Sequence, residues 1–178
     1  MERRSSFGLL ILGLAAVLLL GACGGSGTTD VPTVQGNGPT LGNEAILMSP
    51  AGLRAEARLL GQPIYWAGEK KGYEYEFQRT SDGYVYVRYL PQGLRAGDAR
   101  KFLTISMYPY VGAFKAVKAA GKGSAFGGPD GSVVYVRPDH SGSVLMAWHG
   151  VQYQIEVYDP RPARSIAVAL SGRVQPVG

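Results

Sequence analysis

The stretch YEYEFQRTSDGYVYVRYL, residues 73–90, contains two runs in which aromatic or aliphatic residues alternate with polar ones. A period of two is typical of strands that bury only one face. Ser81-Asp82-Gly83, between the runs, has the composition of a turn. The stretch therefore predicts an antiparallel hairpin, and the domain around it must cover the apolar face of that hairpin.

The length of the turn decides the register of this hairpin. A two-residue turn would pair Phe77 with Arg88 and mix polar with apolar side chains on each face. A three-residue turn with Gly83 in the left-handed region pairs Phe77 with Val87 and Glu76 with Arg88. Because a slip of one residue would move every side chain to the other face, we predict the three-residue turn. Glu76 and Arg88 are then expected to form a solvent-exposed ion pair worth less than about 1 kcal/mol.

The flanking sequence predicts the remaining elements of the domain. Ser49-Pro50 is typical of a helix start, and Asp159-Pro160 is expected to start the final helix in the same way. The final helix is expected to turn Ile166, Ala167 and Leu170 inward, and a two-residue turn at His149-Gly150 is expected in a second hairpin. The predicted elements are a helix over 50–60, strands at 64–66 and 102–108, a helix within 111–123, a strand at 133–137, the hairpin over 144–158 and the final helix.

These elements predict an α+β fold. We expect an antiparallel sheet built from two hairpins plus single strands, with the helices packed on one face. The order helix, strand, hairpin occurs near 50–90 and again near 111–158, which suggests an internal duplication.

The first 22 residues have the pattern of a secretory signal peptide. Arg3 and Arg4 precede an uncharged run that begins at Phe7. The alternative is an uncleaved membrane anchor, which needs roughly 20 apolar residues. The run from Phe7 to Ala22 offers 16 residues, three of them glycine. The two arginines leave open whether export follows the general or the twin-arginine route.

The sequence Leu20-Gly21-Ala22-Cys23 resembles the lipobox of bacterial lipoproteins. The resemblance implies transfer of diacylglycerol to the Cys23 sulfur, cleavage between Ala22 and Cys23, and acylation of the new amino group by a fatty acid such as palmitate. An unmodified thiol in a signal anchor is the alternative. On this interpretation the chain comprises a signal peptide (1–22), a lipidated cysteine with a flexible Gly/Thr/Pro-rich linker (23–43) and a single α+β domain (44–178).

The composition of the processed chain limits its partners. Without residues 1–22 it holds 16 basic and 12 acidic side chains, a formal net charge of +4. This excess favours anionic neighbours, such as a cell-wall polymer, lipid headgroups or an acidic envelope protein, although it also serves solubility alone. We expect membrane attachment through the lipid and no nucleic-acid partner. Since Cys23 is the only cysteine, no disulfide forms within the chain.

No arrangement of residues in the sequence predicts catalysis. His140 lies between Asp139 and Ser141, but three neighbours in sequence rarely converge on one atom, and no Gly-x-Ser-x-Gly motif is present. Glu74 and Glu76 are expected side by side on one strand, not on two sides of a scissile bond. We therefore predict no catalytic residues, no metal site and no cofactor.

The tyrosines are the remaining candidates for a binding surface. Most of the eleven fall on strand faces assigned to the core. Tyr84 and Tyr86 are exceptions, because they lie on the opposite face beside Arg88.

The sequence thus predicts a lipid-anchored extracytoplasmic accessory or binding module without catalytic activity, on the outer side of the cell membrane. A carrier of an apolar ligand or lipid is the alternative, and an extracytoplasmic hydrolase is the third hypothesis. The chain also resembles uncharacterised lipoproteins of high-GC Gram-positive bacteria in the patterns VYVRYLP (85–91) and QIEVYDP (154–160). That resemblance implies only a membrane location and a fold.

Overall fold

A computed structural model describes residues 44–178. The predictions for the signal peptide, Ala22, Cys23 and the linker lie outside the described residues. Among residues 44–178, no helix combines the length and the apolar character that crossing a membrane requires.

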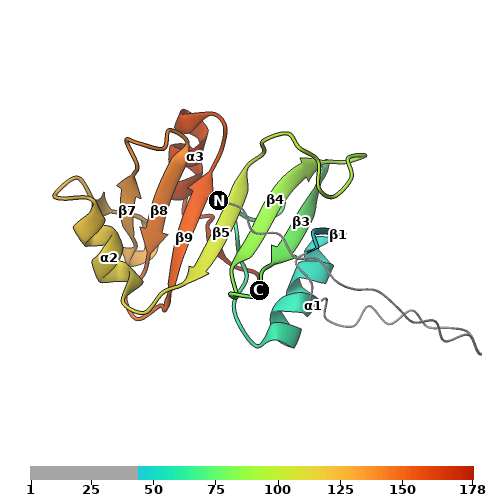
Figure 1. Ribbon diagram of the computed structural model, residues 1–178, viewed down its shortest axis with the longest axis horizontal. Helices are drawn as coiled ribbons and strands as arrows, with labels where there is room; N and C mark the ends of the chain where they lie inside the picture. The colour runs from blue at the N-terminus through green and yellow to red at the C-terminus, as the bar shows by residue number, and fades with distance from the viewer. Residues whose placement is uncertain (1–43) are drawn as a thin grey trace, which may run out of the picture. The chain divides into compact units, whose positions relative to one another are not determined.

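Eight strands form one antiparallel sheet in the order β1-β3-β4-β5-β9-β8-β7-β6 (Figure 1). Its strands are β1 (Ile46–Met48), β3 (Tyr73–Arg79), β4 (Val85–Pro91), β5 (Thr104–Pro109), β6 (Phe126–Gly127), β7 (Val133–Val136), β8 (Ser143–Ala147) and β9 (Tyr153–Tyr158). A second sheet pairs β2 (Tyr65–Trp66) with β10 (Gln175–Pro176). The helices are α1 (Pro50–Leu60), α2 (Ala113–Ala120) and α3 (Pro162–Leu170), and one turn of 3₁₀ helix, η1, spans Pro129–Gly131. The predicted α+β class and antiparallel sheet are confirmed.

Helix α1 begins and ends where the sequence predicts. The Ser49 hydroxyl accepts a hydrogen bond from the Gly52 amide at 3.1 Å, and Pro50 occupies the first turn, where its missing N–H costs nothing. Gly61 ends the helix with a φ of +61°, a left-handed conformation that favours glycine.

The register of the first hairpin is confirmed. Phe77 lies opposite Val87, and Glu76 lies opposite Arg88. The Thr80 amide donates to the Tyr84 carbonyl at 2.9 Å, which leaves a three-residue turn in which Gly83 has a φ of +78°. Phe77 and Val87 are buried in the main core.

The prediction that Glu76 is exposed is wrong. Its side chain is only 2% exposed, and its Oε1 accepts a hydrogen bond from Arg88 Nη1 at 2.5 Å. Its Oε2 accepts a hydrogen bond from the Gly97 amide at 2.6 Å, while Arg88 Nη2 donates to the carbonyls of Asp98 and Arg100. The connection between β4 and β5 therefore folds over this face of the hairpin, which the alternation within the hairpin does not reveal.

The predicted two-residue turn of the second hairpin is also wrong. Val144 pairs with Val157 and Met146 with Ile155, so a longer loop at residues 148–152 joins the strands. The register differs from the prediction by two residues. Because side chains alternate with a period of two, this shift keeps every side chain on its predicted face. The pattern of apolar residues therefore could not distinguish the two registers.

Helix α3 starts two residues later than predicted. Pro162 occupies its first turn and Arg161 its N-cap, while the Asp159 carboxylate accepts the Arg161 amide at 2.9 Å in the turn before the helix. Ser165 and Ala169 are the buried residues of the helix. The inward orientation predicted for Ala167 and Leu170 is wrong, since both are exposed.

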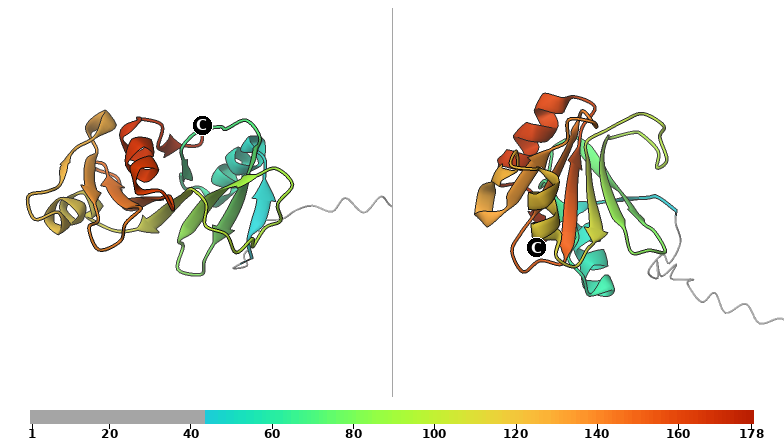
Figure 2. Two further views of the ribbon diagram at one scale, coloured as in Figure 1. Left: turned by 90° about the horizontal axis from the view of Figure 1, so that it is seen from above. Right: turned by 60° about the vertical axis from the view of Figure 1, so that its left-hand side comes forward.

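The helices divide between the two faces of the sheet. Helices α1 and α3 lie on one side and α2 on the other (Figure 2). Helix α2 packs on Leu145 and Ala147, whereas α3 contributes to the core that holds Val144 and Met146. Strand β8 is buried along its whole length and so needs cover on both faces, in contrast to the one-sided packing expected. If the two halves of the domain were duplicates, a two-fold axis perpendicular to the sheet between the antiparallel strands β5 and β9 would relate them. Such an axis would place α1 and α2 on the same face, so the observed arrangement does not support a simple duplication.

Candidate anion-binding groove

The residues that the sequence singled out for chemistry do not form a site. Asp139 accepts a hydrogen bond from Arg137 at 3.1 Å and lies 3.5 Å from His140 Nε2, and both Asp139 and His140 are exposed. Glu76 is held by Arg88, so it is not paired with Glu74 for hydrolysis. In the described part of the chain, no group of three or more His, Cys, Asp or Glu residues is placed to hold a metal ion.

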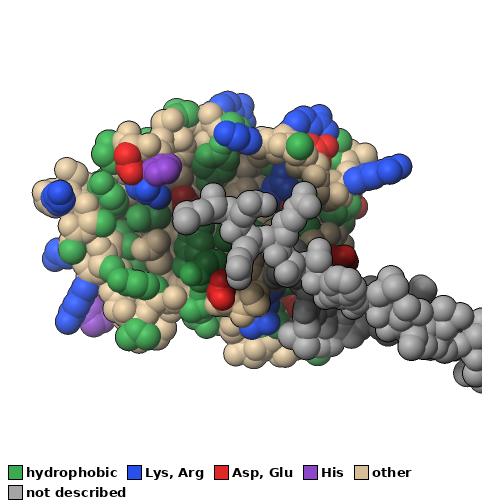
Figure 3. Space-filling view, viewed as in Figure 1, with side chains coloured by type: hydrophobic (Ala, Val, Ile, Leu, Met, Phe, Trp, Pro, Cys, Tyr) green, Lys and Arg blue, Asp and Glu red, His purple; other side chains and the backbone are tan. Residues whose placement is uncertain are grey.

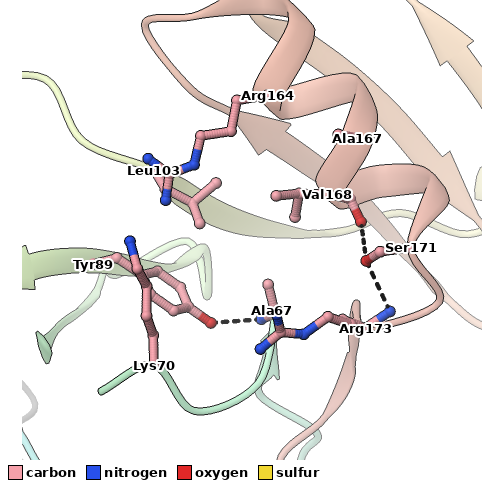
Figure 4. Close-up of a pocket in the computed structure, with 9 residues that line it drawn as sticks. All are labelled: Ala67, Lys70, Tyr89, Leu103, Arg164, Ala167, Val168, Ser171 and Arg173. Carbon is pink, nitrogen blue, oxygen red and sulfur yellow. Dashed lines mark hydrogen bonds between the residues drawn. The ribbon is translucent and has the colours of Figure 1, made fainter. Parts of the chain in front are cut away.

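Two adjoining hollows lie beside α3, and we call them together the basic groove. Figure 4 shows the residues that line the first hollow. The volumes of the two hollows are about 300 Å³ and about 280 Å³, and both hollows are lined by Tyr89, Leu103 and Arg164. The first hollow also includes Lys70, Val168 and Arg173, and the second includes Lys101, Asp159 and Arg161. Apolar side chains therefore form part of its walls, and cationic side chains line both hollows.

Two tyrosines of the first hairpin hold the loop that carries Lys70. The Tyr89 hydroxyl accepts a hydrogen bond from the Ala67 amide at 2.6 Å and donates to the Gly68 carbonyl at 3.0 Å. The Tyr75 hydroxyl accepts the Lys70 amide at 2.8 Å. Because Tyr75 and Tyr89 are both almost fully buried, they fix the backbone of this loop against the sheet.

Arg173 reaches the same loop from the end of α3. Its Nη2 donates to the Glu69 carbonyl at 3.2 Å, and its amide donates to the Ser171 hydroxyl. Gly68 has a φ of +80°, and a Cβ there would lie 3.3 Å from Arg173 Nη2. A glycine at this position therefore allows both the loop conformation and the approach of the guanidinium group.

Asp159 orients the arginines at the start of α3. One carboxylate oxygen accepts the Arg161 amide, and the other lies 3.2 Å from Arg164 Nη1. That second oxygen is buried without a well-aligned hydrogen bond. Asp159 is fully buried, whereas the Arg164 side chain is 28% exposed, so the arginine still presents part of its guanidinium group to the groove.

The basic groove accounts for most of the net charge of the described domain. Residues 44–178 contain 16 basic and 11 acidic side chains. Five of the basic residues and one acidic residue line the groove. The rest of the domain has 11 basic and 10 acidic residues and is therefore nearly neutral. The groove is thus an electropositive surface with an apolar floor, suited to an anionic ligand.

No protein-family model, curated protein or solved structure matches the chain. The function of the basic groove therefore has to be inferred from its own residues. Sequence reasoning missed these residues because they come from separate segments around 67–73, 101–103 and 159–173. The only signal was the excess of positive charge, which does not say where the charges meet.

The other face of the sheet carries a cluster formed by Tyr84, Tyr86 and Tyr108. The rings of Tyr84 and Tyr86 contact that of Tyr108, with centroids 5.2 and 6.1 Å apart. Figure 3 shows green side chains, a class that includes tyrosine, in the hollowed middle of this face. Burial raises the pKa of Tyr108, whose hydroxyl donates to Glu156 at 2.9 Å. Glu156 also accepts a hydrogen bond from Ser143, so we interpret the cluster as packing of the sheet.

Tyr73, at the edge of the basic groove, reports the positive field there. A hydrogen bond from Lys70 lowers the pKa of the Tyr73 hydroxyl below 10.0, and the charges of Arg164 and Arg161 lower it further. We expect Lys70→Met to return this pKa toward 10.0, whereas Lys118→Met on α2 should leave it unchanged. Titration of labelled tyrosine by NMR, assigned with Tyr73→Phe, measures the shift. The same Tyr73 pKa in the Lys70→Met variant and in the wild type would contradict this account.

The lowered pKa of Tyr73 determines whether this residue stabilises the folded state at high or at low pH. The folded state releases this proton at a lower pH than the unfolded chain does. Tyr73 therefore contributes stability that is present above the unfolded pKa near 10 and is lost as the pH falls through the folded value. Tyr89 acts in the opposite direction, because burial raises its pKa. Its contribution is present below pH 10 and is lost as the pH rises further.

Proposed function

We propose that this protein is a lipid-anchored extracytoplasmic binding module that captures an anionic ligand in the basic groove. The observation that carries the proposal is the concentration of five cationic side chains in one groove of an otherwise nearly neutral domain. The lipobox-like sequence that ends at Cys23 supports the location. The groove would then face the envelope from the end of a short tether.

The chemistry of the groove favours binding over catalysis. Its charged side chains are hydrogen-bond donors, with the exception of Asp159. Asp159 is engaged by Arg161 and Arg164, and the Ser171 hydroxyl donates to the Val168 carbonyl at 2.7 Å. These groups recognise negative charge, and neither Asp159 nor Ser171 is poised as a base or nucleophile.

The dimensions of the groove support the alternative carrier function less well. Each hollow is at the small end of the roughly 300–1,000 Å³ that ligand pockets span. A carrier would need to shield a long apolar chain, whereas this groove offers a modest apolar floor under a charged rim. Native mass spectrometry of the whole chain tests this alternative, since a carrier should retain lipid after detergent removal.

Binding of pyrophosphate tests the proposal directly. We expect the whole chain, purified in non-ionic detergent, to bind pyrophosphate in isothermal titration calorimetry. Arg164 lines both hollows, so Arg164→Gln should weaken binding by about 10- to 100-fold, the equivalent of losing a charge-assisted hydrogen bond of about 1.5–3 kcal/mol.

Lys118→Gln is the matched control for this experiment. Lys118 is exposed on α2, on the other side of the sheet, and its replacement removes the same charge from the protein. Equal losses in the Arg164→Gln and Lys118→Gln variants would show that pyrophosphate responds only to net charge and would overturn the proposal.

A further inference from the structure

We infer that the ligand of the basic groove is a linear polyanion that occupies both hollows, and not a single small anion. This inference rests on the proposed function and specifies its ligand. It follows from the distribution of the cations, the shape of the groove and the kind of cation that lines it.

The cations are spread along the groove. Lys70 and Arg173 line the first hollow, Lys101 and Arg161 line the second, and Arg164 lines both. One phosphate group is satisfied by two or three charge-assisted donors, such as one bidentate guanidinium and an ammonium group. A single anion in the first hollow would not reach Lys101 or Arg161, and one in the second would not reach Lys70 or Arg173. A chain with an anionic group in each hollow would contact both sets.

The two hollows adjoin and are open to solvent, as a bound polymer requires. Tyr89, Leu103 and Arg164 line both hollows and therefore lie between them. Because each hollow is open to solvent, a chain that passes over these shared side chains can reach both. Leu103 and Val168 supply apolar surface against which the uncharged atoms between two anionic groups can pack.

The arginines suit a polymer whose anionic groups carry two or more oxygens. Three of the five cations are arginines, and Arg173 and Arg164 are held by the Glu69 carbonyl and by Asp159, respectively. A guanidinium group fixed by one partner retains further donors in a planar fork, which matches the oxygens of a phosphate or a carboxylate group. The remaining cations, Lys70 and Lys101, act as point charges on either side.

Binding of phosphate chains of different length tests the inference. The whole chain in non-ionic detergent is titrated with orthophosphate, with tripolyphosphate and with long-chain inorganic polyphosphate. We expect affinity to rise by about tenfold or more from orthophosphate to long-chain polyphosphate. The logarithm of the polyphosphate affinity should fall with the logarithm of salt concentration with a slope of about −3, because four or five contacts each contribute roughly −0.7.

Variants in each hollow measure the contribution of that hollow to binding. Arg173→Gln and Lys101→Gln should each lower the affinity for polyphosphate and reduce the magnitude of its salt slope by about 0.7, while Lys118→Gln should change neither. Poly-glutamate with the same number of charges, titrated in parallel, distinguishes a phosphate polymer from a carboxylate polymer as the source of the repeated charge.

The outcomes distinguish this inference from the proposed function. If orthophosphate binds as tightly as polyphosphate and Arg164→Gln abolishes both, the groove is a single-anion site, and only the inference fails. If no phosphate compound binds, or if the groove variants and Lys118→Gln behave alike, the proposed function fails as well. Circular dichroism of each variant verifies that it is folded.

Discussion

Replacing Glu76 with alanine is expected to destabilise the domain by about 3–5 kcal/mol, the range for removing one partner of a buried ion pair. The carboxylate is 2% exposed and accepts hydrogen bonds from Arg88 and from the Gly97 amide. Its loss would leave the guanidinium group without its counter-charge and the Gly97 amide without an acceptor. The residue would also no longer hold the connection between β4 and β5 against the sheet. Urea denaturation followed by circular dichroism measures the loss.

Two further variants make the Glu76 result interpretable. Glu74 lies two residues away on the same strand face and is only half-buried, so Glu74→Ala should cost less than about 1 kcal/mol. The double variant Glu76→Leu/Arg88→Met removes both charges and should lose less stability than Glu76→Ala alone. A Glu76→Ala protein within 1 kcal/mol of wild type would mean that the ion pair is solvated in solution, as the sequence alone predicts.

Replacing Cys23 with serine is expected to release the protein from membranes. On the proposed lipid anchor, a serine oxygen would replace the sulfur that is expected to accept the diacylglyceryl group. Each buried methylene contributes about 0.8 kcal/mol to membrane binding, and two acyl chains anchor stably where one binds only marginally. The wild-type protein should therefore stay with the membrane fraction through a wash in high salt, and Cys23→Ser should appear in the soluble fraction.

A wash in 1 M salt separates lipid anchoring from electrostatic attraction. Charge attraction is screened over about 3 Å at 1 M salt, so the positive charge of the domain cannot hold it there. Intact-mass analysis of the retained wild-type protein should show a chain that begins at Cys23 and carries acyl mass. A retained protein that begins at Met1 with a free thiol would instead support the uncleaved anchor.

The two hairpins show what the sequence can and cannot predict about this fold. In the first, a slip of one residue would have mixed the faces and separated Glu76 from Arg88, so the register was predictable. In the second, the true register differs from the predicted one by two residues and keeps every side chain on its predicted face. The apolar character of Val144 and Val157 therefore could not distinguish the two registers. The alternation of apolar and polar residues determines which face of the sheet a side chain occupies. The length of the loop determines which of the registers that differ by two residues is formed.

The helix starts show a similar limit. Ser49-Pro50 offers one start for α1, and the structure uses it. Two prolines follow Asp159, and both Pro160 and Pro162 are compatible with a first helical turn, so the local sequence does not choose between them. Burial of Glu76 was unpredictable for a different reason, because its cover comes from residues about twenty positions away.

The basic groove was harder to predict from the sequence than any helix or strand. Lys70, Lys101 and Arg173 come from three separate segments, and only tertiary packing brings them together. Composition gives the number of charges and says nothing of their position. Tyr75 and Tyr89 are buried in the core as predicted, but their hydroxyls have a second role, since they hold the loop that carries Lys70.

The pairing of β10 with β2 makes the C-terminal residues part of the groove's framework. Gln175 pairs with Trp66, and the Val177 amide donates to the Ile64 carbonyl at 2.8 Å. Arg173 lies just before this clasp, and Lys70 lies just after β2, so two cations far apart in sequence depend on it. Removal of the last four residues is expected to break the contact between Arg173 and the Glu69 carbonyl, although none of those four residues lines the groove. Removal of these residues is therefore expected to weaken anion binding in the groove, although it removes no charge.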